Sequence, residues 1–330
     1  MDEKKILACP ICNLQRVQKW GKQNSKQRYR CTNCFHNFIL RNDGVKKANQ
    51  FVWFYKWVME RQVYQNLIRD SCMSQSSLQR LFKFYLKSPP ENTVESKGHV
   101  HLLIDGTYFE NGLCLVLYYD YDIQYVQLFR QTNQEKFREI KEDLLNLKKM
   151  GTQIYSVTCD GHKSIMKAVA KAFPNAIMQR CIVHVKRQIK NYLGAKPQLI
   201  QARELLYYSK QITQIRSQEQ AANWLIQVYD WYSLHEAFIN QKSVNELTGR
   251  SWYTHKHLHQ AATHLINAIP NLFSYLNDEQ IPKSTNQIEG YFAHLKEKLT
   301  LHRGLRLEAK KNFIKWYLHF KNQEKRNRFF

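Results

Sequence analysis

The sequence predicts an α/β protein in which a mixed β-sheet is interrupted by an all-α insertion and preceded by two small N-terminal modules. Short apolar and aromatic runs between residues 99 and 184 alternate with two amphipathic helical patterns, which is typical of a sheet covered by helices. Residues 191–280, in contrast, contain helical patterns only. The first 42 residues hold two closely spaced cysteine pairs, which indicates a separate module.

The net charge of the chain favours a polyanionic partner. Its 330 residues include 50 Lys and Arg against 27 Asp and Glu, which gives a net charge of +23. Such a surplus, spread along the whole chain, points first to nucleic acid. No apolar stretch approaches the roughly 20 residues of a membrane-spanning helix, and the N-terminus lacks the apolar core of a signal peptide. We therefore expect a cytoplasmic, nucleoid-associated protein whose cysteines are thiols or metal ligands.

Residues 1–42 have the cysteine spacing of a zinc ribbon. Cys9 and Cys12 form one Cys-x-x-Cys pair, and Cys31 and Cys34 form a second after eighteen residues. Two such pairs supply four thiolates to one tetrahedral Zn²⁺ ion. A redox dithiol, the alternative, needs only one pair and explains the second poorly.

The segment between the two cysteine pairs is basic and aromatic, and no acidic residue occurs from Lys4 to Asn42. We expect this surface to face DNA phosphates. The residues predicted to contact DNA here are Arg16, Lys19, Lys22, Lys26, Arg28 and Arg30.

Residues 43–90 are predicted to form a helix-turn-helix-like DNA-binding domain. Apolar residues recur at helical spacing before and after a break at residues 70–73, and Ser74 after the break is a suitable N-cap. Two short helices joined by a tight turn are typical of this motif. A helical hairpin that only connects domains is the alternative. The polar segment 87–98, with two prolines, reads as a linker.

The first part of the catalytic core is assigned to residues 91–190. Strands are expected at 99–109, 113–120 and 125–131, with Asn111 and Gly112 forming a hairpin turn between the first two. A helix at 134–150, a strand at 153–160, a helix at 163–173 and a strand at 176–184 follow. This order of elements is that of a ribonuclease-H-like fold.

Three acidic residues are the candidate catalytic groups and magnesium ligands. Asp105 lies on the first strand of the core and Asp160 at the end of the fourth, so that neighbouring strands would bring both carboxylates to one sheet edge. Glu289 lies on a predicted C-terminal helix. It stands at the edge of the apolar stripe of this helix, so its side chain can point toward the interior. Two divalent ions about 4 Å apart require several anionic oxygen ligands of this kind.

The segments around these acids resemble the signatures of the mutator-type DDE transposases of insertion sequences. The resemblance lies in "DGTYF" with Asp105, "CDGHKSIMKAVAKAFPNAIMQRCIVHVKRQI" with Asp160, and "IPKSTNQIEGYFAHLKEKL" with Glu289, and it extends from about residue 9 to residue 320. It implies a ribonuclease-H-like catalytic domain behind a zinc ribbon, two Mg²⁺ or Mn²⁺ ions, and cut-and-paste or copy-and-paste movement of an insertion element. The catalytic triad of the family falls on the three acids above.

The Cys-x-x-His motif of the family falls on Cys181 and His184. The resemblance places both on the fifth strand, beside the metal site, with His184 as a further catalytic residue. Lys186 and Arg187, directly after it, are predicted to contact DNA. A second zinc site made by Cys159, His162, Cys181 and His184 is discounted, because successive strand side chains point to opposite faces and Asp160 lies inside the first pair.

Residues 191–280 are assigned to an all-α insertion, and residues 281–330 to the C-terminal helices of the core and a basic tail. The insertion contains aromatic residues that stack on DNA bases or, more often in helical bundles, fill the core: Trp224, Trp231, Trp252 and Tyr253. Lys296 and Lys298 begin the tail and are predicted to line the DNA path.

Three functions are compatible with this pattern. The first is a DNA transposase that cleaves the ends of an insertion element and joins the 3′-hydroxyl ends to target DNA by two-metal-ion chemistry. The others are a transposase-derived DNA-binding regulator and a nuclease without strand transfer. The presence of all three acids favours activity. The expected partners are double-stranded DNA, as terminal inverted repeats and target, and a second copy of the chain. We also expect one structural Zn²⁺ ion in the chain.

Overall fold

The computed structural model describes residues 7–9, 11–12, 14–23, 25–39, 43–95 and 98–329; residues 96 and 97 of the predicted linker lie outside this set. The chain divides into two compact units, Met1–Leu81 and Phe82–Phe330.

The first unit begins with a three-stranded antiparallel sheet. Its strands are β1 (Val17–Gln23), β2 (Lys26–Cys31) and β3 (Asn37–Ile39), in the order β1-β2-β3. The sheet buries little, because most of its residues are exposed or half-buried, but Cys31 at the end of β2 is fully buried. Such a module lacks a hydrophobic core of its own and depends on another source of stability.

Three helices complete this unit. They are α1 (Asp43–Met59), α2 (Tyr64–Ser71) and α3 (Gln75–Lys87), of which α3 runs into the second unit. The two short helices predicted around a break at 70–73 are therefore confirmed, and α1 precedes them. Cys72 ends α2 in the left-handed region at φ 54°, and the Ser74 hydroxyl accepts a hydrogen bond from the Ser77 N–H at 3.3 Å, which caps α3.

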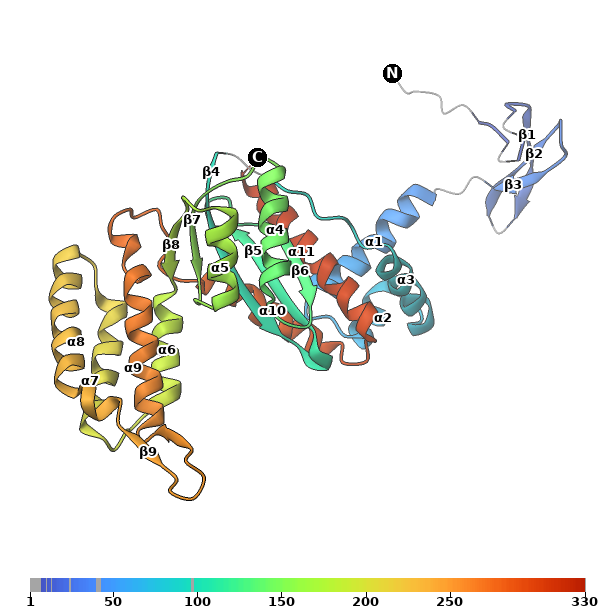
Figure 1. Cartoon of the computed structure of the whole chain (residues 1–330). Helices are drawn as coiled ribbons and strands as arrows, with labels where there is room; N and C mark the ends of the chain where they lie inside the picture. Colours follow the sequence, from blue (N-terminus) through green and yellow to red (C-terminus); the bar gives the residue numbers. More distant parts are fainter. Residues whose placement is uncertain are drawn as a thin grey trace. The chain divides into compact units, whose positions relative to one another are not determined.

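The second unit is built on a five-stranded mixed sheet (Figure 1). Its strands are β4 (His99–Tyr108), β5 (Cys114–Asp120), β6 (Tyr125–Thr132), β7 (Gln153–Cys159) and β8 (Ile177–Arg180). The order is β6-β5-β4-β7-β8: the first three strands along the chain pair antiparallel, whereas β4, β7 and β8 are parallel. This confirms the predicted sequence of strands and helices and the mixed sheet.

The predicted Asn-Gly turn joins β4 to β5. Asn111 and Gly112 both have positive φ, at 62° and 69°, which is the conformation that this residue pair favours in hairpins. The Phe109 N–H donates to the Leu113 carbonyl at 2.8 Å and closes the loop.

Helices cover both faces of the sheet (Figure 1). The helices α4 (Phe137–Lys149) and α5 (Lys163–Ala172) bury one apolar stripe each against one face. The helices α10 (Asn286–Leu301) and α11 (Leu307–Phe329) contact β4 and β6, respectively. The amide of Asn322 on α11 both donates to the Val126 carbonyl and accepts from the Val126 N–H at 3.0 Å, so it binds β6 as another strand would.

The basic tail is therefore part of the core. Four of its aromatic residues face the interior, since Phe313, Trp316, Tyr317 and Phe320 are all buried on α11.

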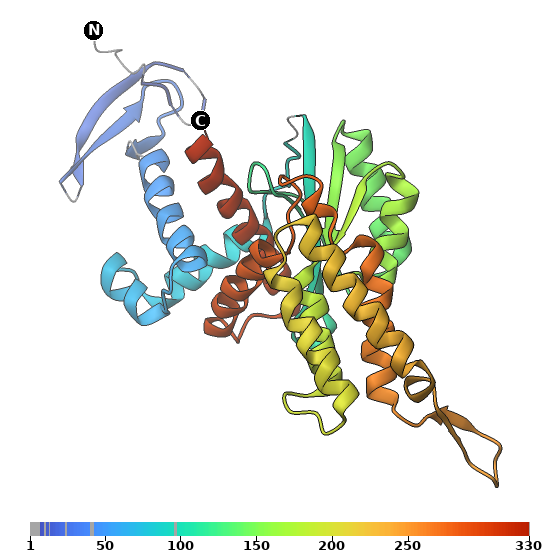
Figure 2. The same cartoon turned by 90° about the vertical axis from the view of Figure 1, so that its left-hand side faces the viewer.

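The inserted segment forms a lobe with its own hydrophobic core (Figure 2). Its helices are α6 (Ile182–Leu193), α7 (Ile200–Gln211), α8 (Gln218–Ile239) and α9 (Lys256–Ala268). The prediction of an all-α insertion is wrong, because β9 (Lys242–Val244) and β10 (Ser251–Tyr253) form an antiparallel hairpin. The Asn245 side chain accepts from the N–H groups of Leu247 and Thr248, and Gly249 has a φ of 65°, which together make the turn.

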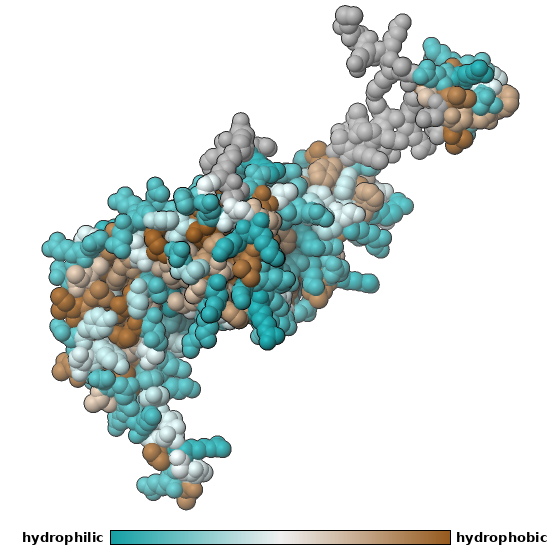
Figure 3. Space-filling model, turned by 45° about the horizontal axis from the view of Figure 1, so that its top comes forward, coloured by the Kyte–Doolittle hydropathy of each residue, from teal (hydrophilic) through white to brown (hydrophobic). Residues whose placement is uncertain are grey.

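The face in Figure 3 shows apolar surface gathered on the helical lobe and at the end of the hairpin, whereas much of the remainder of this face is hydrophilic. Among the exposed apolar residues of the lobe are Leu234, Leu247 and Trp252. Trp224 and Trp231, in contrast, are buried in its core, as helical bundles usually require.

We predict that Asp143 on α4 is a major contributor to the stability of the second unit. It is 4% exposed, and its carboxylate accepts hydrogen bonds from the Tyr118 hydroxyl at 2.9 Å and from two nitrogens of Arg130 at 2.6 Å. Replacement Asp143→Ala removes the acceptor of the Tyr118 hydroxyl and of Arg130 Nε and should lower the free energy of unfolding by about 3 kcal/mol. This loss is measured by unfolding both proteins in urea and monitoring the transition by circular dichroism.

Glu142→Ala is the matched control. Glu142 contacts the same guanidinium at 2.9 Å but is 62% exposed. Its replacement should cost less than about 1 kcal/mol. Equal losses in the two variants would contradict the prediction.

Candidate active site and metal centres

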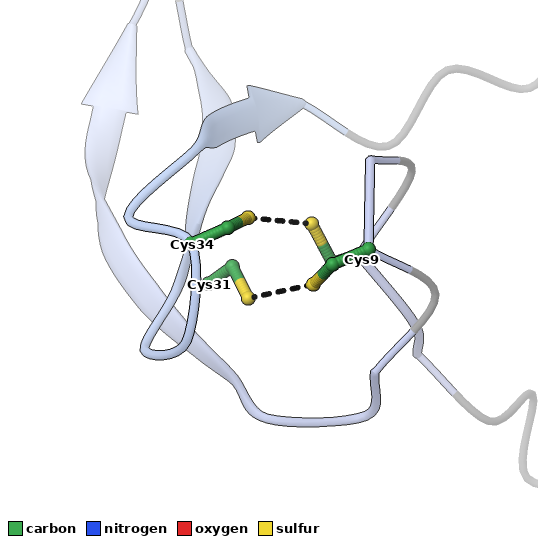
Figure 4. Close-up of side chains that lie close together, drawn as sticks. Cys9, Cys31 and Cys34 are labelled. Carbon is green, nitrogen blue, oxygen red and sulfur yellow. Dashed lines mark hydrogen bonds between the residues drawn. The ribbon is translucent and has the colours of Figure 1, made fainter.

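Four cysteine sulfurs converge in the N-terminal module (Figure 4). The sulfur atoms of Cys9 and Cys34 are 3.5 Å apart, as are those of Cys12 and Cys31, and all four lie within 4.8 Å of one another. Metal–sulfur bonds of about 2.3 Å in a tetrahedron require sulfurs a little under 4 Å apart. One pair precedes β1, and the other spans the end of β2 and the turn after it, so the small sheet brings them together. The cluster is compatible with the predicted zinc site.

Backbone N–H groups favour the metal-binding form of one of these cysteines, Cys31. Hydrogen bonds from the backbone N–H groups of Cys34 and Asn33 lower the pKa of Cys31 to about 6. A thiol must lose its proton to ligate Zn²⁺, so this environment favours the ligating form.

The second candidate site lies in the second unit, where the pairing of β4 with β7 ends. The two strands are parallel and pair Ile104 with Cys159, which places Asp105 and Asp160 side by side at the next position of each chain. Asp105 is 6% exposed, and its Oδ1 accepts from the Gly106 N–H at 2.9 Å. The Oδ1 of Asp160 accepts from the His162 N–H at 2.7 Å, which fixes the turn before α5. The predicted adjacency of these strands is confirmed.

The segment that returns from the helical lobe is tied to the same sheet edge. The Thr158 hydroxyl on β7 donates to the Pro282 carbonyl at 2.6 Å, and the Ile182 N–H at the start of α6 donates to the Lys283 carbonyl at 3.1 Å. Because both anchors precede α10 by a few residues, they position the first turn of that helix at the acidic site.

Thr285 is the hydrogen-bonding centre of the site and was not predicted as a functional residue. It is fully buried at the N-cap position of α10, yet its hydroxyl does not cap the helix. The hydroxyl donates to Asp105 Oδ2 at 3.2 Å and lies 3.3 Å from His184 Nδ1 and 3.6 Å from Cys181 Sγ. The backbone N–H of Thr285 also donates to Cys181 Sγ at 3.4 Å.

Asp105, His184 and Glu289 each offer a ligand atom within 4.8 Å of the others. Glu289 lies in the first turn of α10, and its Oε1 is 3.4 Å from His184 Nε2. Arg187, one turn after His184 on α6, forms a bidentate ion pair with Glu289 at 3.0 and 3.1 Å. Asp160 is outside this tight group and adjoins it through Asp105. Carboxylate oxygens are the ligands that Mg²⁺ prefers, so the donor set fits a divalent cation.

The prediction that a fifth strand carries Cys181 and His184 is wrong. The strand β8 ends at Arg180, Cys181 is the N-cap of α6, and His184 lies in the first turn of that helix. Ile182, Val185 and Ile189 are buried at helical spacing and favour the helix over a longer strand. Both residues still lie at the acidic site, as the motif implied.

Burial and the mutual repulsion of the carboxylates shape the electrostatics of the site. Burial raises the pKa of Asp105 to about 7; the nearby His184 opposes this shift and Asp160 adds to it. Burial alone would lower the pKa of His184, but Cys181, together with Asp105, raises it to about 9. The imidazolium therefore balances part of the negative charge. A divalent cation would take over that role and lower the pKa of its carboxylate ligands.

Glu135 is a fourth carboxylate at this edge that sequence reasoning missed. Its side chain is 9% exposed, and burial, together with Asp160, raises its pKa to about 7. Gly106 makes room for it, since a Cβ there would lie 2.0 Å from Glu135 Oε1. The residue lies between β6 and α4, where one acid among several in "NQEKFREIKED" carries no distinguishing signal.

A cleft of about 700 Å³ opens beside the acids. Its walls come from the loop after β7, the start of α5, the end of β8, and the facing sides of α6 and α9. Both Asp160 and His184 line it.

The predicted DNA-contacting residues differ in exposure. Arg16, Lys19, Lys22 and Lys26 are exposed in the first unit, whereas Arg28 and Arg30 are half-buried, with the Arg30 guanidinium 4.5 Å from the Trp20 ring centre. In the second unit Arg187 and Lys296 are exposed, and Lys186 donates to the Thr213 hydroxyl at 3.3 Å. Lys298 departs from the expectation, because it faces inward on α10 and is 8% exposed.

The alternative Cys₂His₂ site receives no support. Among the described residues, the only groups of three or more potential ligands are the four cysteines and the cluster of Asp105, His184 and Glu289. Cys159 is fully buried on β7, with its sulfur 4.0 Å from that of Met178.

Comparison with known protein families shows which family the chain belongs to. The model of the Mutator family of transposases matches residues 129–303, which is more than half of the chain and includes Asp160, His184 and Glu289. No curated protein matches the chain. The protein therefore belongs to the Mutator family of transposases, a class of proteins that act on DNA. In the part of the chain that the structure describes, no helix is both long and apolar enough to cross a bilayer.

We predict that the purified protein contains about one zinc per chain, bound by the four cysteines. The double replacement Cys31→Ser, Cys34→Ser removes half of the ligands and should abolish the metal, as measured by elemental analysis. Because the small sheet buries little else, this variant should also lose the structure of residues 7–39. Cys72→Ser, at an exposed cysteine outside the cluster, is the control and should retain the metal. Protein without zinc, or zinc retained in the double variant, would contradict the assignment.

Proposed function

We propose that this protein is a DNA transposase that cleaves the ends of an insertion element and joins the resulting 3′-hydroxyl ends to target DNA. The observation that carries the proposal is the convergence of acids from distant segments. Asp105 and Asp160 adjoin through strand register, and Glu289 is brought to them by the return segment of the lobe. Family membership supports the general role.

The strand order β6-β5-β4-β7-β8, with Asp105 on β4 and Asp160 directly after the adjoining β7, supports a ribonuclease-H-like core. In this proposal Asp105, Asp160 and Glu289 hold two Mg²⁺ or Mn²⁺ ions. When bound, such ions activate a water or hydroxyl and neutralise the charge that develops on a phosphate in an in-line displacement.

The remaining residues of the site hold these acids in place. Thr285 directs one oxygen of Asp105, and the His162 N–H directs one oxygen of Asp160. Arg187 occupies both oxygens of Glu289, so metal binding requires that this ion pair be shared or released. Once released, an exposed guanidinium next to the acids is well placed to bind a DNA phosphate in a bidentate manner.

The N-terminal modules and the basic surface are proposed to bind the DNA. The zinc ribbon and the helices α2 and α3 would recognise the terminal inverted repeats, and the exposed bases near the acids would hold the cleaved strand. Two ends must be brought together for transposition, so we propose that at least two copies of the chain act on the DNA.

Asp160→Asn should abolish DNA nicking. The asparagine retains an oxygen to accept from the His162 N–H, so the fold should be unchanged, but a charged ligand is lost. We expect the rate of nicking of a duplex that carries the element's end, in Mg²⁺, to fall by at least about a hundredfold. Gel analysis of end-labelled DNA measures the rate.

The control for this change is Asp230→Asn, at an exposed position of α8, which should nick as the unchanged protein does. Binding of the duplex should be similar in all three proteins. Undiminished nicking by Asp160→Asn would refute the proposed chemistry. Joining of the nicked strand to a plasmid distinguishes a transposase from a nuclease, and nicking without joining would favour the nuclease.

Thr285→Val should slow nicking by about tenfold. The change keeps the shape of the side chain and removes the hydroxyl that donates to Asp105, and a hydrogen bond to a charged group typically contributes this much. Thr285→Ser restores a hydroxyl and should recover most of the rate. If the valine and serine variants lose activity equally while both remain folded, Thr285 has only a packing role.

A further inference from the structure

The cleft beside the acids has features that the cleavage chemistry does not use. It has a volume of about 700 Å³, within the range of pockets that enclose small molecules, and it is far too small for a duplex. One end is continuous with the acidic site through Asp160 and His184, and the other end lies between α6 and α9 of the helical lobe.

The end of the cleft nearest the acids is suited to a phosphate group. Arg180 lines it, is 5% exposed, and its Nε has no hydrogen-bond partner among the described residues. Gly161, with a φ of 88°, makes this possible, because a Cβ there would lie 1.8 Å from Arg180 Nε. The first turn of α5 opens on the same space, carries Lys163 and has no acidic residue. A buried guanidinium with an unused donor needs an acceptor.

The far end of the cleft is suited to a nucleobase. Its walls carry two aromatic rings and several amide side chains. The rings are those of Tyr192 on α6 and His264 on α9, and the amides are those of Gln188 on α6 and of Gln260 and Asn267 on α9. The Nε2 of His264 is buried and has no partner among the described residues, and its ring lies edge-on to Tyr192 with centres 6.2 Å apart. Amides present a donor and an acceptor together, as the edges of bases do, and an aromatic side chain can contact the face of a base.

We propose that this cleft binds one unpaired nucleotide of the DNA strand next to the acidic site, with its phosphate at Arg180 and its base between α6 and α9. The identity of the strand rests on the proposed function. A duplex cannot enter the cleft, so the nucleotide must leave the base stack, which costs less where the DNA is already unpaired or distorted. The helical lobe thereby distinguishes distorted DNA ends from intact duplex.

The test compares two duplexes of the same length that carry 2-aminopurine at the same position, where it is paired with thymine in one duplex and has no partner base in the other. Binding is measured with Ca²⁺ in place of Mg²⁺ to limit cleavage. The unchanged protein should bind the duplex with the unpaired nucleotide about tenfold more tightly. Thr263→Trp fills the cleft from an exposed position of α9 and should reduce this ratio to below about twofold.

Asn191→Trp is the control, because Asn191 is exposed on α6 and does not line the cleft, so the ratio should be unchanged. Asn267→Ala, a smaller change at an exposed lining position, should lower the ratio about threefold and covers the case in which Thr263→Trp does not fold. No preference in the unchanged protein, or the same preference in the two lining variants, overturns the proposal.

The two proposals can fail separately. A preference for the unpaired nucleotide without any nicking in Mg²⁺ would support the proposal for the cleft and refute the transposase chemistry. Nicking that depends on Asp160, without a preference for the unpaired nucleotide, would support the transposase chemistry and refute the proposal for the cleft.

Discussion

The candidate active site depends on the parallel pairing of β4 with β7. Ile104 lies opposite Cys159, so the register alone places Asp105 beside Asp160, where the pairing of these two central strands ends. A slip of one residue would turn one of these side chains to the opposite face of the sheet. The register is held by strands whose residues are buried on both faces, so the cost of moving it is the cost of repacking the core. The position of the acids is therefore a property of the whole sheet.

Carboxylates brought together in this way repel each other and lose solvation. The chain compensates with groups from two helices that flank the edge. Thr285 donates a hydrogen bond to Asp105, His184 adds positive charge, and Arg187 pairs with Glu289. These groups reach the site because the chain that leaves for the lobe at α6 and the chain that returns before α10 are joined by the hydrogen bond between Ile182 and Lys283. The lobe can thus be large without loosening the site.

Much of this arrangement is predictable from the sequence, for physical reasons that differ between elements. The strands of the sheet have dense apolar runs and clear turns, and Asn111 with Gly112 adopts the conformation its sequence favours. Asp105, Asp160 and Glu289 stand out because each follows or interrupts an apolar pattern. Glu135 could not be found, since its importance comes from burial against Gly106, a contact between segments that no local pattern records. Thr285 stands at the N-cap position of α10, where a hydroxyl usually caps the helix, and only the tertiary contacts divert its hydroxyl to Asp105.

One prediction failed where a short pattern allowed two structures. The run "AIMQRCIVH" is apolar enough for a strand throughout, but Ile182, Val185 and Ile189 also have helical spacing, and burial in the core of the lobe selects the helix. The change matters for function. Because α6 begins directly after Cys181, one helix carries His184 and Arg187 to the acids and Gln188 and Tyr192 to the cleft, one turn further along. A strand would have turned alternate residues to opposite faces and could not have lined both with one continuous surface. The helix thus couples the acidic site to the lobe, because one rigid element lines both the acids and the proposed nucleotide cleft.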